Sequence, residues 1–297
     1  MEKVDRITTI QQYNDMMGVE TLHPLVSVIN FSECEPLPFK RAYYGMYCVF
    51  LKDCNCGPMT YGNKYYDYQE GTIVTMAPGQ VYGIDRPQKV QPHGWALVFH
   101  PDFINGTELG RTIKEYHFFS YDIDEALHIS QKERVLIEQC FQNMRSELQE
   151  KIDKHTQRVV CHEIQLLLDY CLRFYDRQFI TRHTANSDLL TRFETLVDDY
   201  LHTDDIKQNG LPSVSYFADK LFLSANYFGD LIKKEMGVSP KDYIQDKLIN
   251  YAKEKLLSSD QPIALVADDL GFQYSNHFTR MFKKYVGVSP SEYRSMN

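Results

Sequence analysis

The sequence predicts an α+β protein, with strands in its first part and helices in the rest. Short runs rich in Val, Ile, Tyr and Phe are separated by turn residues up to about residue 120, as in a β region. Near residue 130 the apolar residues change to a helical spacing, and a pattern of about 50 residues then repeats within the last hundred. With 297 residues, of which 43% are hydrophobic, the chain is long enough for two domains with separate cores.

The β region is expected from about residue 20 to residue 120. Its clearest strands are HPLVSVINF, YYGMYCVFL, GTIVTMAP and GWALVFH, and turn signals such as those at residues 61–63 and 78–79 separate them. Several short strands at this spacing predict a sandwich or a small barrel.

Two amphipathic helices follow the β region. The first carries Ile137, Cys140, Phe141, Met144 and Leu148, and the second carries Ile164, Leu167, Leu168, Cys171 and Tyr175. Each set follows the spacing of one helix face. We expect the two helices to be antiparallel. Two uses of their apolar surface remain open, namely packing on the β region and forming a dimer seam.

A linker is predicted at residues 181–188, TRHTANSD, because this segment is polar and has no apolar period. Beyond it the chain is predicted to be helical. The first helix of this part has an apolar stripe that includes Phe193, Val197 and Tyr200, and residues 202–213 interrupt it.

The composition excludes several classes of protein. The N-terminus lacks the basic start and apolar run of a signal peptide, and no stretch approaches the roughly 18 apolar residues of a membrane span, so we expect a cytoplasmic protein. The seven cysteines are scattered, which fits reduced thiols better than a disulfide framework. Cys54 and Cys56 are the only close pair, and a metal site there would need further ligands, for which Cys34 and Cys48 are weak candidates.

The charge is unevenly distributed along the chain. The net charge of −8 argues at first against a nucleic-acid partner. Residues 212–297, however, hold eleven Lys and Arg against ten Asp and Glu, a net of +1, which leaves −9 for residues 1–211. The C-terminal part is therefore close to neutral, and charge alone does not decide whether it binds DNA.

The repeat within the last hundred residues consists of two helices joined by a turn. Val214, Phe217, Ala218 and Leu221 of the first copy recur 49 residues later as Ile263, Val266, Ala267 and Leu270. In the second helix, Tyr227, Phe228, Leu231, Ile232 and Met236 recur 50 residues later as His277, Phe278, Met281, Phe282 and Val286. Each copy is thus a helix-turn-helix unit, and the difference of one residue falls in the turn.

Both copies end with the same four residues, GVSP, at 237–240 and 287–290. Gly237 and Gly287 supply the left-handed conformation that commonly ends a helix. The Ser-Pro pair that follows is typical of an N-cap and first residue of the next helix. We therefore expect a connecting helix over residues 240–257, and Pro262 begins the second unit.

Residues 187–297 resemble the AraC/XylS family of bacterial transcription regulators. The resemblance is carried by A-D-K-L, S-x-x-Y-F and G-V-S-P in the first copy, and by VADDLGFQYSNHFTRMFKKYVGVSPSEYR in the second. The β region with its two helices is similar to the sensor half of that family. The resemblance implies a cupin-like sensor domain at 1–122, a helical dimerisation or packing segment at 123–180, and a tandem helix-turn-helix DNA-binding domain at 187–297.

The resemblance also implies a function. It indicates a sequence-specific regulator that binds double-stranded DNA as a homodimer, activates transcription through contact with RNA polymerase, and responds to a small-molecule effector in a cupin-like β-barrel. A second possibility keeps DNA binding without an effector and makes the barrel a protein-interaction module.

The residues expected to contact DNA lie opposite the apolar stripe of each recognition helix. In the second copy they are Ser275, Asn276, Thr279 and Arg280, with His277 at the edge and Lys283 and Lys284 further along. In the first copy they are Asn226, Lys233 and Lys234. Asp230 takes the position of Arg280 and repels phosphate, so the second helix is the stronger candidate reader. In the connecting helix, Leu248 stands where the family usually has an Arg.

An enzyme of the cupin type is the alternative class. Its metal would need His and carboxylate ligands on adjacent strands, whereas His23, His93, His100 and His117 are far apart and include no H-x-H pair. We therefore expect no catalysis, no metal and no cofactor. The effector-binding residues are undetermined, and the aromatic candidates are Tyr43, Tyr44, Tyr47, Tyr65, Tyr66, Tyr68 and Trp95.

Overall fold

The computed structural model describes residues 5–39, 41–52, 59–61, 64–66, 71–82, 86–122, 125–181 and 183–296. These residues form two compact units, residues 1–181 and residues 182–297, which are described separately below. The boundary falls between Thr181 and Arg182. Cys54 and Cys56 lie outside the described residues.

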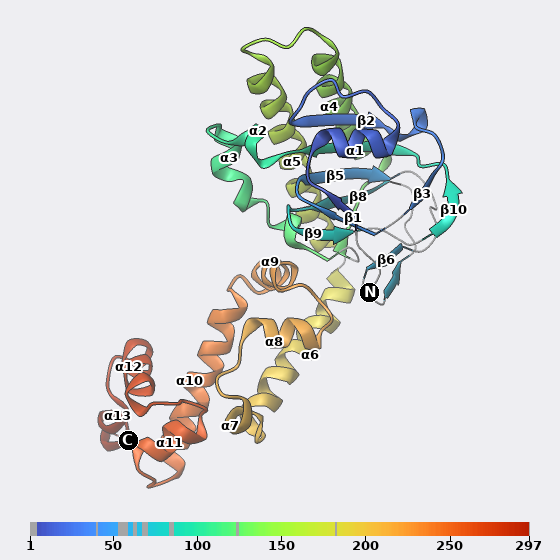
Figure 1. The fold of residues 1–297 in the computed structure, drawn as a ribbon. Helices are drawn as coiled ribbons and strands as arrows, with labels where there is room; N and C mark the ends of the chain where they lie inside the picture. Colours follow the sequence, from blue (N-terminus) through green and yellow to red (C-terminus); the bar gives the residue numbers. More distant parts are fainter. Residues whose placement is uncertain are drawn as a thin grey trace. The chain divides into compact units, whose positions relative to one another are not determined.

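The first unit is built on antiparallel strands (Figure 1). Its main sheet has five strands in the order β12 (Leu127–His128), β8 (Thr72–Met76), β5 (Tyr47–Lys52), β11 (Gly94–Phe99) and β2 (Val26–Asn30). A second sheet has the order β1 (Asp5–Ile7), β4 (Ala42–Tyr44) and β9 (Gln80–Tyr82), with β1 parallel to β4. Two further pairs are β3 (Leu37–Phe39) with β10 (Arg86–Val90), and β6 (Met59–Tyr61) with β7 (Lys64–Tyr66). The four predicted strand runs are thereby confirmed.

Both faces of the main sheet are covered. On one face Cys48, Phe50, Ala96 and Val98 join a buried cluster with residues of α1 (Ile10–Met17) and of the second sheet. On the other face Trp95 stacks on Phe141, with ring centroids 5.8 Å apart. This double burial explains why β5 and β11 are nearly continuous apolar runs rather than alternating ones. Within the described residues these sheets are separate and form no closed barrel.

The prediction of β structure up to residue 120 is wrong for the segment after β11. This segment forms α2 (Pro101–Ile104), α3 (Glu108–Thr112) and the 3₁₀ turns η2 (Ile113–Glu115) and η3 (His117–Ser120). His100 caps α2 by accepting a hydrogen bond from the backbone N–H of Asp102, and Thr107 caps α3 by accepting one from Gly110. These caps, with Pro at the first position of α2, favour helical turns over strands.

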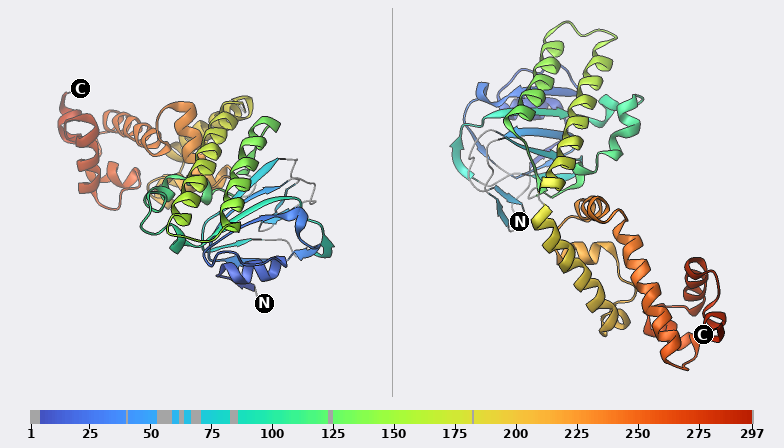
Figure 2. Two further views of the ribbon diagram at one scale, coloured as in Figure 1. Left: turned by 90° about the horizontal axis from the view of Figure 1, so that it is seen from above. Right: turned by 180° about the vertical axis from the view of Figure 1, so that it is seen from behind.

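The two predicted amphipathic helices are α4 (Gln131–Gln149) and α5 (Thr156–Thr181), and all ten predicted apolar residues are buried. The views in Figure 2 show the two helices side by side against the strands. α4 begins with a capping box between Ser130 and Glu133. Glu133 also forms an ion pair with Arg177 of α5, at 2.9 Å, which fixes the two helices to each other.

The second unit is entirely helical, and its first helix corrects the predicted linker. α6 (His183–His202) includes most of the polar segment 181–188. Asn186 is buried there and donates a hydrogen bond of 2.7 Å to Glu235. A tertiary contact therefore stabilises a helix that the local sequence does not predict. The interruption predicted at 202–213 contains a further short helix, α7 (Asp205–Asn209).

The remaining helices of this unit are α8 (Val214–Lys220), α9 (Ala225–Met236), α10 (Pro240–Ser258), α11 (Ile263–Asp269), α12 (Ser275–Val286) and α13 (Pro290–Met296). Phe193 of α6 lies at the centre of the first half. Its ring contacts Phe217, Phe228 and Tyr243, at centroid distances of 5.7, 5.0 and 5.2 Å. α6 and α10 thus form the support against which α8 and α9 pack.

Two further properties concern the described residues as a whole. None of the described helices has the length and hydrophobicity needed to cross a membrane. The five cysteines that lie in the described part of the chain, at positions 34, 48, 140, 161 and 171, are buried free thiols. Burial raises the pKa of Cys140 to about 11, so this thiol is protonated at neutral pH.

Candidate nucleic-acid interface

The two repeats fold as helix-turn-helix units, α8 with α9 and α11 with α12. In both turns the second residue after the first helix has a left-handed backbone, Phe222 with φ 61° and Gly271 with φ 74°. Ser224 then caps α9 by accepting from the backbone N–H of Tyr227. The second turn has one more residue, and Tyr274 stands at the N-cap of α12 without a side-chain capping bond. The predicted difference of one residue in the turn is confirmed.

The predicted helix ends are also confirmed. Gly237 and Gly287 adopt left-handed conformations, with φ of 74° and 89°. Ser239 accepts a hydrogen bond from the backbone N–H of Asp242 at the start of α10. Ser289 and Glu292 exchange the two hydrogen bonds of a capping box at the start of α13. Each recognition helix is therefore followed by a fixed change of chain direction.

The two helix-turn-helix units are joined by more than α10. At the end of α10, Arg294 of α13 donates to the carbonyls of Leu256 and Gln261, at 2.9 and 2.6 Å. A second connection links α7 to α11, where Lys207 forms an ion pair of 2.8 Å with Asp269. The first connection therefore fixes α13 to the end of α10, and the second fixes α11 to α7.

Gly271 is essential to the second connection. A Cβ atom on Gly271 would lie 2.5 Å from the carbonyl oxygen of Ile206 and 2.9 Å from the carbonyl carbon of Gly210. Only a glycine allows the turn of the second unit to approach α7 so closely. In the alignment of the two copies, Gly271 corresponds to Phe222. This correspondence reveals the left-handed turn that the copies share, but it does not reveal the contact of Gly271 with α7.

The predicted contact residues of α12 share one solvent-facing surface. Ser275, Asn276, Arg280, Lys283 and Lys284 are exposed, and Thr279 is half-buried. Beneath them Phe278 and Phe282 are fully buried and hold the helix on its unit. The hydroxyl of Thr279 donates to the carbonyl of Ser275 within the helix, at 3.0 Å.

His277 differs from its counterpart in the first copy. The repeat pairs it with Tyr227, which is buried, and so placed His277 in the apolar stripe. The structure instead exposes His277, whose ring lies against the ring of Tyr274, itself 57% exposed, at a centroid distance of 5.5 Å. The structure therefore does not keep the pairing with the buried Tyr227, and the exposure of His277 agrees with its predicted place at the edge of the contact surface.

The surface of α9 is less basic. Asn226, Lys233 and Lys234 are exposed, as a contact role requires, and Asp230 is half-buried among them. Glu235 points to α6, where Asn186 donates to it. Leu248 of α10, at the position where an Arg was expected from the resemblance, is buried and supplies no cation to the surface.

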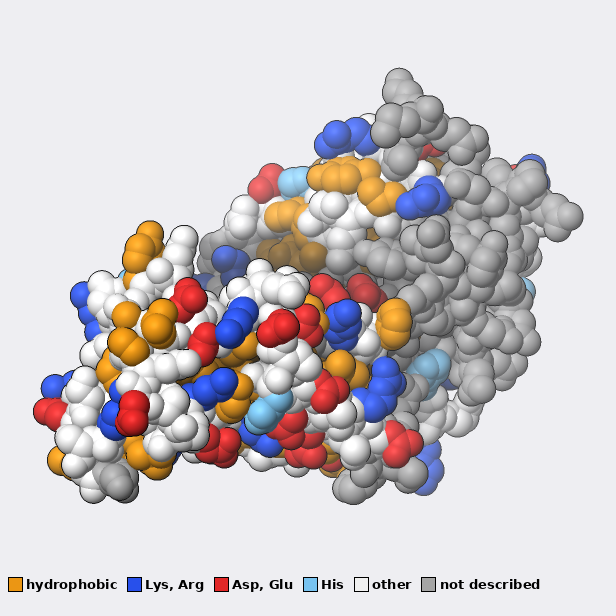
Figure 3. Space-filling model, turned by 90° about the horizontal axis from the view of Figure 1, so that it is seen from below, with side chains coloured by type: hydrophobic (Ala, Val, Ile, Leu, Met, Phe, Trp, Pro, Cys, Tyr) orange, Lys and Arg blue, Asp and Glu red, His pale blue; other side chains and the backbone are white. Residues whose placement is uncertain are grey.

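The charges of the second unit are finely mixed. Acidic and basic side chains alternate over the coloured surface in Figure 3. Against this background α12 carries Arg280, Lys283 and Lys284 and no carboxylate, whereas α9 carries two lysines and two carboxylates. Basic charge that faces solvent is thus concentrated on α12 of the two recognition helices.

The aromatic candidates for an effector pocket are divided by the structure. Tyr44 belongs to the buried cluster between the sheets, but Tyr47 stacks on Phe99 and Trp95 stacks on Phe141, both on the face covered by helices. The guanidinium of Arg6 lies 4.5 Å from the ring centre of Tyr43. The placement of Tyr68 and of the side chains of Tyr65 and Tyr66 lies outside the described residues.

The histidines considered as metal ligands have other surroundings. The ring of His23 packs edge-on against Phe103, at 5.2 Å, and His100 caps α2. Among the residues that the structure describes, no three His, Cys, Asp or Glu side chains are grouped to hold a metal ion.

Comparison with known proteins agrees with the geometry of the second unit. Residues 217–296 match the family model of a helix-turn-helix domain. A curated relative, described as the probable transcriptional regulator LumQ of Photobacterium leiognathi, is 24% identical over 209 residues, covering 68% of this chain and 74% of that protein.

Two solved structures are also similar to the chain. The C-terminal domain of AraT, a response regulator from Geobacillus stearothermophilus, is 28% identical over 37% of this chain and 85% of its own, with a TM-score of 0.33. ToxT from Vibrio cholerae is 14% identical over 91% of this chain and 97% of its own, with a TM-score of 0.30. Because both TM-scores are low, the finding that supports a helix-turn-helix domain is the family match of residues 217–296 and not these two structures.

Proposed function

We propose that the protein regulates transcription by reading DNA chiefly through α12, which lies in the helix-turn-helix domain that residues 217–296 match. The observation that carries the proposal is the surface of this helix. It presents Asn276, Arg280 and Lys283 to solvent, with no carboxylate among them, above a fixed base of Phe278 and Phe282. The helix-turn-helix match and the curated relative, described as a probable transcriptional regulator, support a regulator rather than an enzyme.

Each side chain on this surface has a defined use in a major groove. Arg280 pairs with the two acceptors of guanine, and Asn276 pairs with adenine. The hydroxyl of Thr279 is bonded within the helix, and its methyl group contacts a thymine methyl. Ser275 and His277 lie at the start of the helix and donate to phosphate or base edges, and Lys283 and Lys284 contact phosphates.

The first recognition helix contributes less. Asn226 is its base reader, and Lys233 and Lys234 contact phosphate. Asp230 opposes phosphate at the position where α12 has Arg280. The connecting helix α10 joins the two units, and in this proposal it holds α9 and α12 at a spacing that suits successive segments of the major groove.

The test of this proposal uses genomic fragments of the host, selected by their binding to the full-length protein. On the selected site, Arg280→Ala is expected to weaken binding by about 1–3 kcal/mol and to relax the preference at one base pair. Asn276→Ala is expected to act similarly at a different base pair. Fluorescence anisotropy at fixed salt measures both effects.

Arg192→Ala is the matched control. It removes an exposed arginine of the same unit, on the support helix α6, and should leave sequence preference unchanged. Equal affinity and preference for the wild type and both α12 variants would show that the reading surface is misplaced.

We also propose that the protein is a homodimer joined through α5. The buried stripe of this helix packs within the unit, yet Val159, Leu166 and Ile180 remain 38%, 42% and 59% exposed. These three residues are 7 and 14 positions apart, so they form a separate row on the side opposite the buried stripe. The sequence left packing and dimerisation as alternatives. In this proposal the buried side of α5 packs within the unit, and the exposed row forms the dimer interface.

Sedimentation velocity tests the dimer. Leu166→Glu places a charge in the row and should convert dimer to monomer at micromolar concentration. Leu172→Glu is the control, because Leu172 is 46% exposed on the same helix but points away from the row. If both variants sediment as the wild type does, the row is not the interface.

The strand region of the first unit is proposed as a cupin-like sensor for a small-molecule effector, with activation through RNA polymerase as the output. The support is the arrangement of covered sheets beside the helices of the proposed dimer. A thermal-shift screen of small metabolites tests it. A broad screen without a stabilising compound would favour the second candidate, an effector-free regulator whose strand region binds a protein.

A further inference from the structure

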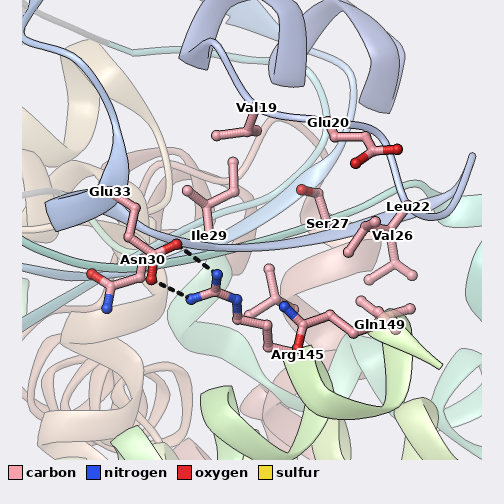
Figure 4. Close-up of a pocket in the computed structure, with 12 residues that line it drawn as sticks. Val19, Glu20, Leu22, Val26, Ser27, Ile29, Asn30, Glu33, Arg145 and Gln149 are labelled. Carbon is pink, nitrogen blue, oxygen red and sulfur yellow. Dashed lines mark hydrogen bonds and ion pairs between the residues drawn. The ribbon is translucent and has the colours of Figure 1, made fainter.

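A pocket of about 290 Å³ lies along β2, at the border of the buried cluster between the sheets, to which its lining residue Ile29 belongs. β2 is the edge strand of the main sheet, and all five of its residues line the pocket. One wall is the segment after α1, including Val19, Glu20 and Leu22, and the other is the end of α4, including Arg145 and Leu148 (Figure 4). The pocket therefore joins the sheet to one of the paired helices.

Arg145 is held in a position suited to a carboxylate. Its guanidinium lies 6.0 Å from the ring centre of Trp95, which limits its rotamers. Both of its terminal nitrogens donate to Glu33 of η1 (Phe31–Glu33), at 2.7 and 2.6 Å. This fork geometry is the one that recognises planar carboxylates.

The present partner of Arg145 is easily exchanged. Glu33 is 54% exposed on a surface turn, so its carboxylate can return to water at little cost. A carboxylate from a ligand would make the same two charge-assisted bonds that Glu33 makes now. Glu33 thus stands where the acidic group of a ligand would bind.

The other charged side chains of the pocket indicate which group a ligand would carry besides its carboxylate. Glu20 lines the pocket and makes no hydrogen bond or ion pair with the described part of the chain. Together with Glu33 and Arg145 it gives the pocket a net charge of −1. A simple anion would leave two carboxylates uncompensated, whereas an ammonium group on the ligand would be attracted to both.

We propose that this pocket is the effector site, and that it binds a small α-amino acid as a zwitterion. The ligand carboxylate replaces Glu33 on Arg145, and the displaced Glu33 accepts from the ligand ammonium. The apolar side chains of Val19, Leu22 and Leu148 surround the ligand side chain. This inference rests on the proposed effector control of the regulator, and it places the effector at the sheet edge rather than between the sheets.

Binding at this site would act on α4. The ion pair of Arg145 with Glu33 joins α4 to a residue 112 positions earlier in the chain. Exchange of Glu33 for a ligand releases η1 from α4, which packs along α5, the helix that carries the row of the proposed dimer on its other side. The pocket is therefore connected to the helices that would transmit the signal.

The experiment uses the full-length protein and needs no DNA. A thermal-shift panel of the twenty amino acids identifies the best binder, and calorimetry then compares three probes. These are that amino acid, its analogue without the amino group, and its analogue without the carboxylate. We expect the complete amino acid to bind at least about tenfold more tightly than either analogue.

Two variants assign the contacts. Arg145→Lys should weaken amino-acid binding at least about tenfold, since a lysine keeps the charge but loses the fork. In Glu33→Gln the analogue without the amino group should gain affinity, because its competitor for Arg145 is gone, and its disadvantage against the amino acid should shrink. Arg134→Gln, which also removes an ion pair from α4 but lies outside the pocket lining, is the control and should bind as the wild type does.

The outcomes separate this inference from the proposed function. No stabilisation by any amino acid, or an unchanged preference for the amino group in Glu33→Gln, overturns the amino-acid site. DNA binding by the same preparation, measured by anisotropy, then shows whether the regulator proposal stands without it. Loss of DNA binding with intact amino-acid binding would overturn the regulator instead.

Discussion

Replacing Gly271 by alanine tests whether the two helix-turn-helix units are coupled through α7. Two separate penalties are expected at this position. Gly271 has φ 74°, and a left-handed backbone costs a residue with a Cβ about 1 kcal/mol relative to glycine. In addition, the new Cβ would lie 2.5 Å from the carbonyl oxygen of Ile206, so α7 and the turn must separate.

The size of the second penalty follows from what the separation disrupts. The atoms that the Cβ meets are backbone atoms of α7 and of Gly210, which cannot rotate away as a side chain does. Forcing such groups apart typically costs about 1–3 kcal/mol. The ion pair between Lys207 and Asp269 would be strained as well. The total expected loss of unfolding free energy is therefore about 2–4 kcal/mol.

Gly237→Ala is a matched control. Gly237 has the same φ of 74° and ends the first recognition helix, but nothing lies within 4 Å of the point that a Cβ atom would occupy there. It should lose only the backbone penalty, about 1 kcal/mol. The difference between the two variants isolates the contact with α7.

Urea denaturation of the full chain measures the effect with an internal reference. Trp95 is the single tryptophan and lies in the first unit, so its fluorescence reports that unit alone. Far-ultraviolet circular dichroism follows the helices of both units. Gly271→Ala should move the dichroism transition to lower urea and leave the fluorescence transition unchanged. Equal losses for Gly271→Ala and Gly237→Ala would refute the close approach of α7.

Two more substitutions test local energetics. Phe222 is 67% exposed and has a left-handed backbone with φ 61°. Phe222→Gly should therefore raise the unfolding free energy of the second unit by about 0.5–1 kcal/mol, measured by urea denaturation. A lower unfolding free energy would mean that the contacts of the Phe222 ring stabilise the unit by more than its backbone strain destabilises it. Partial burial tends to raise the pKa of Glu133, but the backbone N–H of Ser130 and the guanidinium of Arg177 lower it below its ordinary value of 4.5. A carboxylate whose pKa is lower in the folded than in the unfolded state stabilises the fold above its unfolded pKa, and this stabilisation is lost as the pH falls through its folded pKa. Glu133→Gln should therefore lower the unfolding free energy of the first unit by about 1 kcal/mol at pH 7 and by progressively less below pH 4.5. Urea denaturation followed by Trp95 fluorescence measures the loss at each pH. A cost that does not change with pH would show that the carboxylate charge is not the cause.

The DNA-binding half shows what the sequence by itself determined. The two helix pairs, their turns and their stops depend on signals within a few residues, such as the left-handed glycines 237 and 287 and the caps Ser239 and Ser289. Local signals of this kind act through backbone geometry and short hydrogen bonds, which neighbouring residues fix. The repeat then doubled each signal, so the solvent-facing surface of α12, with His277 at its edge, was also predicted.

Contacts between distant residues decided the rest. Segment 183–188 is helical, and Asn186 within it donates to Glu235, 49 positions away, a contact that the local sequence does not reveal. The approach of Gly271 to Ile206 and the fork of Arg145 on Glu33 join residues 65 and 112 positions apart. No local pattern encodes such pairs, because their energy depends on which surfaces the completed fold brings together. The candidate DNA-reading helix α12 can therefore be predicted from the sequence, whereas the candidate effector pocket along β2 is formed only when the chain folds.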